Sequence, residues 1–322
     1  LVLLQVRTPR KILWAATAAV VALVGMFAAA NRIERSVEAL TYNDPVVYYQ
    51  QTAYQKVVLT DYQDDLRMYL NGQLQFSSLD EARYHETLSA SAMTSVKDPA
   101  HVLVLGGGDG LLAREILRYP SVKDVTIVDI DPGVTELARS NRLLKDLNKA
   151  SLSDPRVNVV NDDAFTYVRD SRATYDVVLV DLVDPSNEKL AKLYSTEFYR
   201  NVEARLAPEG VMVTQATSTF FSPHAFSTVA STVATSQPDR QILPFSTNIP
   251  SFGEWGFVLS TRTPQNLISQ PLPEGLTYQD RETLEFIMRT KPARTETMEP
   301  STLLHPRIVE VYNRDMRQWR YY

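Results

Sequence analysis

The feature that most constrains the fold is a glycine-rich turn, LGGGDG at 105–110, between an apolar run and a helix-like segment. Glycines at a strand-to-helix turn permit positive φ angles and let a ligand approach the backbone closely. The turn is shared by dinucleotide binders and adenosyl-sulfonium binders. Asp109 favours the second class, because its carboxylate would repel a pyrophosphate and attract an ammonium or sulfonium cation. The candidate ligand-binding positions in this turn are Gly106, Gly108, Asp109 and Gly110.

The segments around that turn alternate between short apolar runs and helix-like runs. We expect strands at 101–105, 125–130, 157–160, 175–180, 210–215 and 255–260, and helices at 111–118, 132–142, 193–206 and 223–235. Short apolar strands joined by helices predict a mostly parallel sheet that is covered on both faces. The expected fold class is therefore α/β, with a Rossmann-like sheet of the S-adenosylmethionine-methyltransferase type.

A small antiparallel β unit is expected before this sheet. The runs 56–60 and 66–70 are strand-like, and Asn71-Gly72 after the second run is a strong hairpin signal. Residues 81–93 and, in the proline-rich tail, 281–289 are predicted helices. We divide the chain into an apolar helix and connector (1–45), a small β domain (46–95), a Rossmann-like catalytic domain (96–262) and a C-terminal helical tail (263–322).

Residues 12–30 carry no charge and lie between basic residues. A helix of this length, rising about 1.5 Å per residue, could just cross a hydrocarbon core of roughly 30 Å. We expect a transmembrane helix and a membrane-associated protein with a cytoplasmic catalytic domain. A secretory signal, suggested by the alanines at 28–30, and a buried soluble helix are the alternatives. Because the chain begins at Leu1 rather than Met, we expect a fragment of a longer membrane region.

Composition excludes several classes of function. The chain of 322 residues has no cysteine, which excludes disulfides, thiolate metal sites and cysteine nucleophiles. Its four histidines lack the spacing of metal ligands, so we expect no metal. The net charge of −5 argues against a nucleic-acid partner and suits a cationic substrate.

Acidic residues follow the second and third predicted strands. Asp129 comes about twenty residues after the glycine turn, where an acid can accept hydrogen bonds from ribose hydroxyls. Asp131 can cap the helix that begins at Pro132. Asp163, followed by Ala164, lies in the loop that passes an adenine in this fold, and a plain helix cap is the alternative.

Two further acids, Asp181 and Asp184, end the fourth predicted strand. Ligands of open α/β sheets bind beyond the carboxyl ends of the strands, so both acids can face one cation. An ammonium must lose a proton before it attacks, and a carboxylate is a suitable acceptor. Together with Asp109, Asp129 and Asp163 they form an acidic rim that would be costly without cationic ligands or hydrogen-bond donors.

The sequence at this point resembles the spermidine synthases, or polyamine aminopropyltransferases, from about Tyr54 to Thr261. The apolar N-terminal segment resembles bacterial members with a membrane domain. The motifs that carry the resemblance, in order, are Tyr54-Gln55, Asn71-Gly72 to Gln75, Asp80-Glu81, Tyr84-His85-Glu86, Gly106–Gly110, Asp129–Asp131, Asp163–Phe165, Asp181–Pro185, Leu193-Tyr194 and Phe198-Tyr199.

The resemblance implies an aminopropyl transfer from decarboxylated S-adenosylmethionine to putrescine or a related polyamine, releasing methylthioadenosine. It implies that Asp181 is the general base and that Asp184 anchors the acceptor. Asp109, with Gln55 beside it, would hold the aminopropyl ammonium of the donor. The implied donor-binding residues are Gln55, Gly106, Gly108, Asp109, Gly110, Asp129, Asp163 and Ala164, and the implied acceptor-binding residues are Tyr84, His85, Glu86, Asp184 and Gln215. The family also implies a homodimer or homotetramer.

Three departures from the family pattern concern the acceptor. His85 stands where many members have glutamine, and residues 249–252 lack a tyrosine that soluble members carry near the acceptor. Ser186-Asn187 replaces a Gly-Pro in the segment expected to close over the site.

The alternative functions are an S-adenosylmethionine-dependent methyltransferase and a non-catalytic polyamine or nucleotide sensor. Asp109 and Asp184 favour a donor that has lost its carboxylate.

Overall fold

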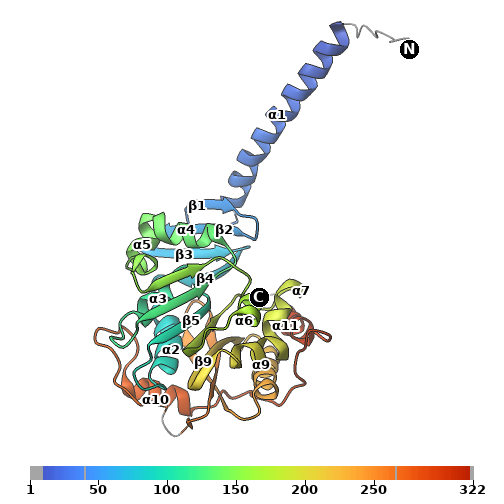
Figure 1. The fold of residues 1–322 in the computed structure, drawn as a ribbon. Helices are drawn as coiled ribbons and strands as arrows, with labels where there is room; N and C mark the ends of the chain where they lie inside the picture. Colours follow the sequence, from blue (N-terminus) through green and yellow to red (C-terminus); the bar gives the residue numbers. More distant parts are fainter. Residues whose placement is uncertain (1–9, 40, 265–266, 320–322) are drawn as a thin grey trace, which may run out of the picture.

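The main sheet of the computed structural model, which describes residues 10–39, 41–264 and 267–319, is formed by strands from the middle of the chain (Figure 1). Its strands are β5 (His101–Gly106), β6 (Asp124–Val128), β7 (Val157–Val160), β8 (Tyr175–Asp181), β9 (Leu206–Ser218), β10 (Gln241–Ile249) and β11 (Gly253–Thr261). Their order is β10-β11-β9-β8-β5-β6-β7, in which β9 to β7 pair in parallel and β10 and β11 pair antiparallel. The predicted α/β fold class is therefore confirmed.

Helices cover both faces of this sheet. Along β5, Val102 and Val104 face one hydrophobic cluster, whereas Leu103 and Leu105 face the other. This alternation explains why the strand is apolar throughout. The helices are α2 (Glu81–Met93), α3 (Leu111–Ile116), α4 (Pro132–Ser140), α5 (Arg142–Leu147), α6 (Ala164–Asp170), α7 (Glu188–Ala191), α8 (Thr196–Glu203), α9 (Pro223–Ser236), α10 (Arg281–Arg289) and α11 (Arg307–Arg317), with 3-10 turns η1 (Ser151–Ser153) and η2 (Lys192–Tyr194).

The connections that leave the neighbouring strands β5 and β8 run to opposite faces. Helix α3, which follows β5, packs into one cluster through Leu112 and Ile116. Helix α8, which follows β8, packs into the other through Phe198 and Val202. Diverging connections of this kind open a crevice at the carboxyl ends of the two strands. The helix expected at 193–206 is shorter in the structure, because the Ser195 side chain caps α8 and the chain re-enters the sheet at Leu206.

The predicted antiparallel unit is a four-stranded sheet in the order β1-β2-β3-β4, formed by β1 (Val46–Gln51), β2 (Lys56–Tyr62), β3 (Asp65–Leu70) and β4 (Gln73–Ser77). Asn71 and Gly72 join β3 to β4 with φ angles of 52° and 81°. Positive φ at both positions is the signature of the tight hairpin turn that the Asn-Gly pair predicts.

Helix α1 (Arg10–Ala39) extends away from the two sheets (Figure 1). Among the helices that the structure describes, none is long and apolar enough to cross a membrane. The prediction of a transmembrane helix and of a membrane-associated protein is therefore wrong. Residues 1–9 of the predicted N-terminal segment lie outside the described residues.

Candidate active site

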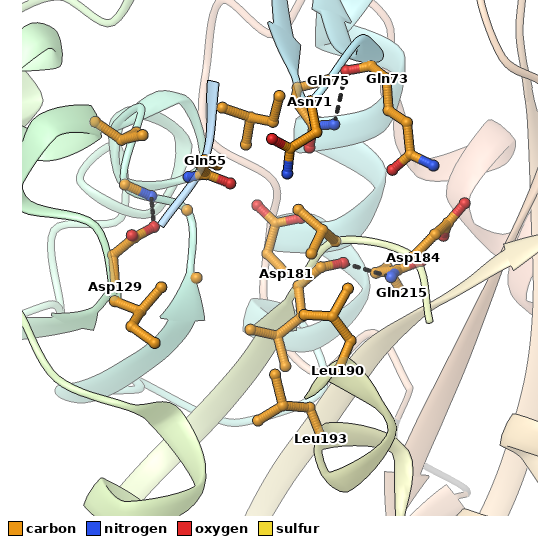
Figure 2. A pocket seen from close by; sticks show the side chains of 18 of the residues that line it. Gln55, Asn71, Gln73, Gln75, Asp129, Asp181, Asp184, Leu190, Leu193 and Gln215 are labelled. Carbon is orange, nitrogen blue, oxygen red and sulfur yellow. Dashed lines mark hydrogen bonds between the residues drawn. The ribbon is translucent and has the colours of Figure 1, made fainter. Parts of the chain in front are cut away.

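A cavity of about 830 Å³ lies at the carboxyl ends of β5, β6, β8 and β9. It brings together most of the residues that the sequence singled out. Figure 2 shows Asp181 between Asp129 on one side and Asp184 with Gln215 on the other. The predicted residues that line it are Gln55, Tyr84, His85, Gly106, Gly108, Asp109, Asp129, Asp163, Ala164, Asp181, Asp184 and Gln215.

The glycine turn brings the backbone of β5 into close contact with two of these acids. Gly106 has a φ of 89°, and a Cβ there would collide with the Asp181 carbonyl. A Cβ on Gly108 would collide with the Asp129 carboxylate, which instead accepts a 3.0 Å hydrogen bond from the Gly108 N–H. Gly110 precedes α3 and does not line the cavity. The turn therefore fixes Asp129 relative to Asp181.

Asp129 and Asp131 have different structural roles: Asp129 lines the cavity, and Asp131 caps a helix. Burial raises the pKa of Asp129 to about 6, although hydrogen bonds from the backbone N–H groups of Asp131 and Gly108 oppose the shift. Asp131 accepts a hydrogen bond from Gly133 N at 2.9 Å and so caps α4, as predicted. It also accepts hydrogen bonds from Thr52 Oγ1 at 2.8 Å and Gln55 Nε2 at 3.0 Å. Asp131 thereby tethers Gln55 beside the glycine turn.

Asp109 lies beside a buried positive charge. Burial raises the pKa of Asp109, while the charge of His85 and a hydrogen bond from Leu111 N oppose the rise. Burial by itself would lower the pKa of His85, but Glu81, 2.8 Å from its Nδ1, outweighs burial and raises that pKa to about 9. Arg114 also donates to Glu81, at 2.8 Å. His85 is therefore an imidazolium at neutral pH, held in place by a buried ion-pair network.

Asp181 is hydrogen-bonded to Tyr84 on helix α2. The Tyr84 hydroxyl donates to Asp181 Oδ1 at 2.5 Å. Burial raises the pKa of Asp181 to about 6; the positive charge of His85 and the Tyr84 hydrogen bond oppose the rise, and the charge of Asp109 adds to it. A carboxylate with a pKa near 6 is ionised at neutral pH and is a stronger proton acceptor than an exposed aspartate.

Asp184 is buried on the other side of Asp181. Its Oδ2 accepts a 2.9 Å hydrogen bond from the Tyr312 hydroxyl, whereas its Oδ1 is buried and has no partner among the described residues. Burial raises the pKa of Asp184 to about 6, and the hydrogen bond from the Tyr312 hydroxyl opposes the rise. Gln215 Nε2 donates instead to the Leu182 carbonyl and the Tyr194 hydroxyl, both at 2.5 Å. The unpartnered oxygen can accept from a ligand.

Asp163 caps helix α6, the alternative that the sequence left open, and also lines the cavity. It accepts a hydrogen bond from Thr166 N at 3.1 Å and pairs with Lys192 Nζ at 2.6 Å. Burial would raise the pKa of Asp163, but the hydrogen bonds from Lys192 and Thr166 outweigh burial and lower it. Asp163 is therefore an ionised group at the edge of the cavity.

Glu86 does not occupy the acceptor channel in which we expected it. It is 1% exposed, and its carboxylate accepts hydrogen bonds at 2.7–2.8 Å from the backbone N–H groups of Thr277, Tyr278 and Gln279. The cause is geometric, because α2 directs Glu86 toward the tail while Tyr84 and His85 line the cavity. Glu86 thus anchors the C-terminal tail.

Several lining residues were missed in the sequence. Trp255 and Phe252 pack against each other with ring centroids 5.3 Å apart and ring planes inclined at 54°, beside the loop where family members carry a tyrosine. Ser251 in this loop donates to Asp80 through both its N–H and its hydroxyl. Lys192 could have been identified from the sequence, because it is a basic residue in the segment expected to close over the site. No sequence pattern identifies the lining residues Tyr312 and Met316 of α11, because they lie in the tail far from every motif.

The electrostatics of the cavity favour cationic ligands. Asp109, Asp129, Asp181 and Asp184 face it from the ends of three strands, β5, β6 and β8, and burial raises the pKa of each. His85 offsets part of this charge. Raised carboxylate pKa values mean that the ionised forms are poorly solvated, so a bound ammonium or sulfonium would stabilise them. The arrangement can bind cations and remove a proton from one of them.

Comparisons with known proteins agree with this geometry. Residues 81–270 match the spermine/spermidine synthase domain. The chain is 41% identical over 282 residues to a polyamine aminopropyltransferase of Oceanobacillus iheyensis, covering 86% of this chain and 55% of that protein. It is 41% identical over 320 residues to polyamine aminopropyltransferase 1 of Streptomyces coelicolor, covering 96% of this chain and 59% of that protein. The chain thus spans little more than half the length of these curated relatives.

Solved structures with the same fold include two spermidine synthases. One, crystallised in complex with the transition-state analogue AdoDATO, superposes with a TM-score of 0.71 at 25% identity, over 76% of this chain and 85% of that chain. The spermidine synthase of Thermotoga maritima superposes with a TM-score of 0.69 at 25% identity, over 76% of this chain and 84% of that chain. Each similarity extends over about three quarters of this chain rather than over a single motif.

Proposed function

The chain belongs to the spermine/spermidine synthase family, and from that premise we propose that it is a polyamine aminopropyltransferase. The donor is decarboxylated S-adenosylmethionine, and the acceptor is putrescine or a related polyamine. The observation that carries the proposal is that Asp109, Asp181 and Asp184 line one cavity with Asp129. Two cationic reactants repel each other in water, and a shared acidic cavity can hold both at bonding distance.

We propose that the donor lies over the glycine turn. Asp129 accepts hydrogen bonds from the ribose hydroxyls, and Asp163, next to Ala164, accepts from the adenine amine. Asp109 holds the ammonium of the aminopropyl group, with Gln55 beside it. The tether of Gln55 to Asp131 and the contact of Gly108 with Asp129 support this placement. The donor's positive charges then offset the desolvation of Asp109 and Asp129.

The acceptor lies between Asp181 and Asp184 in this proposal. Asp181 takes a proton from the attacking ammonium, and the freed nitrogen attacks the methylene carbon next to sulfur. The new C–N bond forms as the C–S bond breaks, and the bonding pair stays on sulfur to give neutral methylthioadenosine. Asp184 anchors the acceptor, with Gln215 beside it. A sulfonium is already an activated leaving group, so the step needs no metal.

In this proposal, two side chains of helix α2 keep the acids of the cavity oriented and ionised. Tyr84 holds Asp181 by a hydrogen bond, which keeps the carboxylate pointing into the cavity. His85 places an imidazolium near Asp109 and Asp181 and so favours their ionised forms. Glu86 takes no part in binding in this proposal, because its carboxylate is occupied by the tail.

Product identification by mass spectrometry tests the proposed function. The chain is incubated with decarboxylated S-adenosylmethionine and a panel of di- and triamines, and in parallel with S-adenosylmethionine. We expect methylthioadenosine and an aminopropylated amine from the first donor only. S-adenosylhomocysteine from the second donor would identify a methyltransferase instead, and donor binding without any product would identify a sensor.

Two further proposals concern organisation. We propose that the chain divides at 45/46, 95/96 and 262/263, with the tail completing the cavity of the catalytic domain. We also propose a homodimer or homotetramer, as in the family. Light scattering coupled to size-exclusion chromatography measures the molar mass, and a monomer at micromolar concentration would contradict the second proposal.

A further inference from the structure

Helix α11 lies outside the region 81–270 that matches the family domain, yet Tyr312 and Met316 of this helix line the cavity. We propose that Tyr312 is a positioning residue that orients Asp184 toward the acceptor, and that Asn313 holds the neighbouring segment in place. The tail would thus build the acceptor end of the site. This inference rests on the proposed function of the same cavity.

Helix α11 is fixed to the body of the protein by a buried carboxylate. Asp315 is 4% exposed and accepts hydrogen bonds from His224 N at 2.9 Å and Ala225 N at 3.1 Å, at the start of α9. Its other oxygen lies 2.8 Å from His224 Nδ1. Asp315 therefore satisfies free N–H groups at the start of α9 and fixes the rotation of α11 about its axis.

The chain that leads to α11 is held by hydroxyl groups on α9. Ser227, Ser231 and Thr232 accept hydrogen bonds from the backbone N–H groups of residues 296, 298 and 301, at 3.1, 2.9 and 2.9 Å. These contacts account for three of the six serine and threonine residues on α9. They leave α11 little freedom to shift, so its side chains can serve as fixed parts of the cavity.

The two oxygens of the Asp184 carboxylate differ in their hydrogen bonding, because Tyr312 donates to only one of them. The hydroxyl donates to Oδ2, and Oδ1 stays buried without a partner among the described residues. A buried carboxylate oxygen without a donor is unfavourable in the free protein, and an ammonium that reaches it restores the missing hydrogen bond. Holding one oxygen also prevents the carboxylate from turning away, which preorganises the other for the acceptor.

Asn313 acts on the adjoining segment, in which Ser186-Asn187 replaces the Gly-Pro of the family. Its side-chain amide donates to the Ser186 carbonyl at 3.3 Å. Asn187 in turn caps α7 by accepting from Lys189 N at 3.0 Å. The segment 184–188 is therefore held by α11 and by its own helix cap.

Steady-state kinetics of Tyr312→Phe test the positioning role. This change removes only the hydroxyl, and we expect the KM of the acceptor to rise roughly tenfold to a hundredfold, as for a hydrogen bond to a buried charge. The kcat at saturating acceptor and the affinity for the donor should change little. Tyr175→Phe is the matched control, because Tyr175 donates or accepts one 2.7 Å hydrogen bond with Tyr167 at the opposite end of β8. An unchanged acceptor KM in Tyr312→Phe would overturn the inference.

A double-mutant cycle separates positioning from general stability. In the background of Asp184→Asn, Tyr312→Phe should raise the acceptor KM no further, because the charge that it orients is gone. If the hydroxyl mattered only for packing, its effect would be the same in both backgrounds. That second result would contradict a positioning role.

Hydrogen exchange provides a readout that does not depend on turnover. In the free protein, Tyr312→Phe and Asn313→Ala should each raise amide exchange rates across residues 184–190, and Tyr175→Phe should not. If the parent chain forms no aminopropylated product but these rates rise, the proposed function fails while α11 still holds the segment. Unchanged rates in both variants would show that α11 does not hold it, whatever the chain catalyses.

Discussion

The hydroxyl of Tyr84 lies 2.5 Å from Oδ1 of Asp181, although the two residues are 97 positions apart in the sequence. The bond links helix α2 to the end of β8, at the centre of the cavity. The pKa of Asp181, the proposed base, therefore depends in part on a hydrogen bond from an uncharged hydroxyl. The consequences can be measured as a function of pH.

Tyr84→Phe should shift the acid limb of the pH profile of kcat/KM upward. The hydrogen bond from Tyr84 favours the ionised form of Asp181, whose pKa is about 6, so its loss raises that pKa. Because the base must be ionised, activity at pH 6 should fall more than activity at pH 8. Initial rates from pH 5 to 9 measure this; an equal loss at every pH would mean that Tyr84 acts by packing alone.

Asp181→Asn should separate binding from chemistry. We expect turnover to fall by roughly two to four orders of magnitude, the usual contribution of a positioned base. Donor affinity, measured by calorimetry, should stay nearly unchanged, because Asp181 contacts the acceptor side. Near-normal turnover would remove Asp181 from the base role. Asp162→Asn, an exposed acid that does not line the cavity, is the matched control.

Asp129→Ala should weaken donor binding. Its carboxylate is the group that we assign to the ribose hydroxyls, and two charge-assisted hydrogen bonds together contribute roughly 100-fold to 10,000-fold in affinity. The KM of the acceptor at saturating donor should change little. Calorimetry with methylthioadenosine, which retains the ribose, checks the assignment without turnover. A loss confined to the acceptor would refute it.

The stability of the ligand-free protein should be greatest at about pH 4. Asp129, Asp181 and Asp184 have pKa values of about 6 in the folded state, against 3.8 when unfolded, so their contribution to stability falls as the pH rises from 4 through 6. His85, whose pKa is raised to about 9, stabilises the fold below about pH 6.5, and this is lost as the pH rises through 9. Glu81, whose pKa is lowered to about 2, stabilises above about pH 4.5, and this is lost as the pH falls toward 2.

Calorimetric melting from pH 3 to 9 measures this profile. The Tm at pH 8 should be lower than that at pH 5, and decarboxylated S-adenosylmethionine should raise it more at pH 8, where the carboxylates are ionised. Asp181→Asn should raise the Tm of the free protein at pH 8, because it removes a buried charge. A Tm that increases steadily from pH 5 to 9 would contradict the placement of these acids.

The sequence predicts the central fold well because its strong signals are local. Helix α2 and helix α10 have the predicted bounds, and the Asn71-Gly72 turn forms where its backbone preference requires. The edge strand β10 was missed, because Pro244 interrupts its apolar run and three polar residues, 246–248, follow. Proline is tolerated there since β10 pairs on one side only, with β11.

The candidate site could be predicted in part for the same reason. Acids such as Asp129 and Asp181 end parallel strands, so the topology alone brings them together. The direction of Glu86 could not be predicted, because it depends on a tail that returns to α2 almost 200 residues later. The contact of Tyr312 with Asp184 also joins residues far apart in the sequence, 128 positions, and no local pattern encodes it.

The crevice between β5 and β8 has one further consequence. One wall comes from residues 106–163 and the other from 181–215 with α11, while residues 54–85 with Phe252 and Trp255 line the rest of the cavity. Substitutions in one stretch can therefore change one wall of the cavity while the other wall keeps its residues. If the proposed function holds, we expect amine preference to vary among relatives more readily than nucleoside recognition, and a graft of 184–193 together with α11 to change the amine preference of the chain.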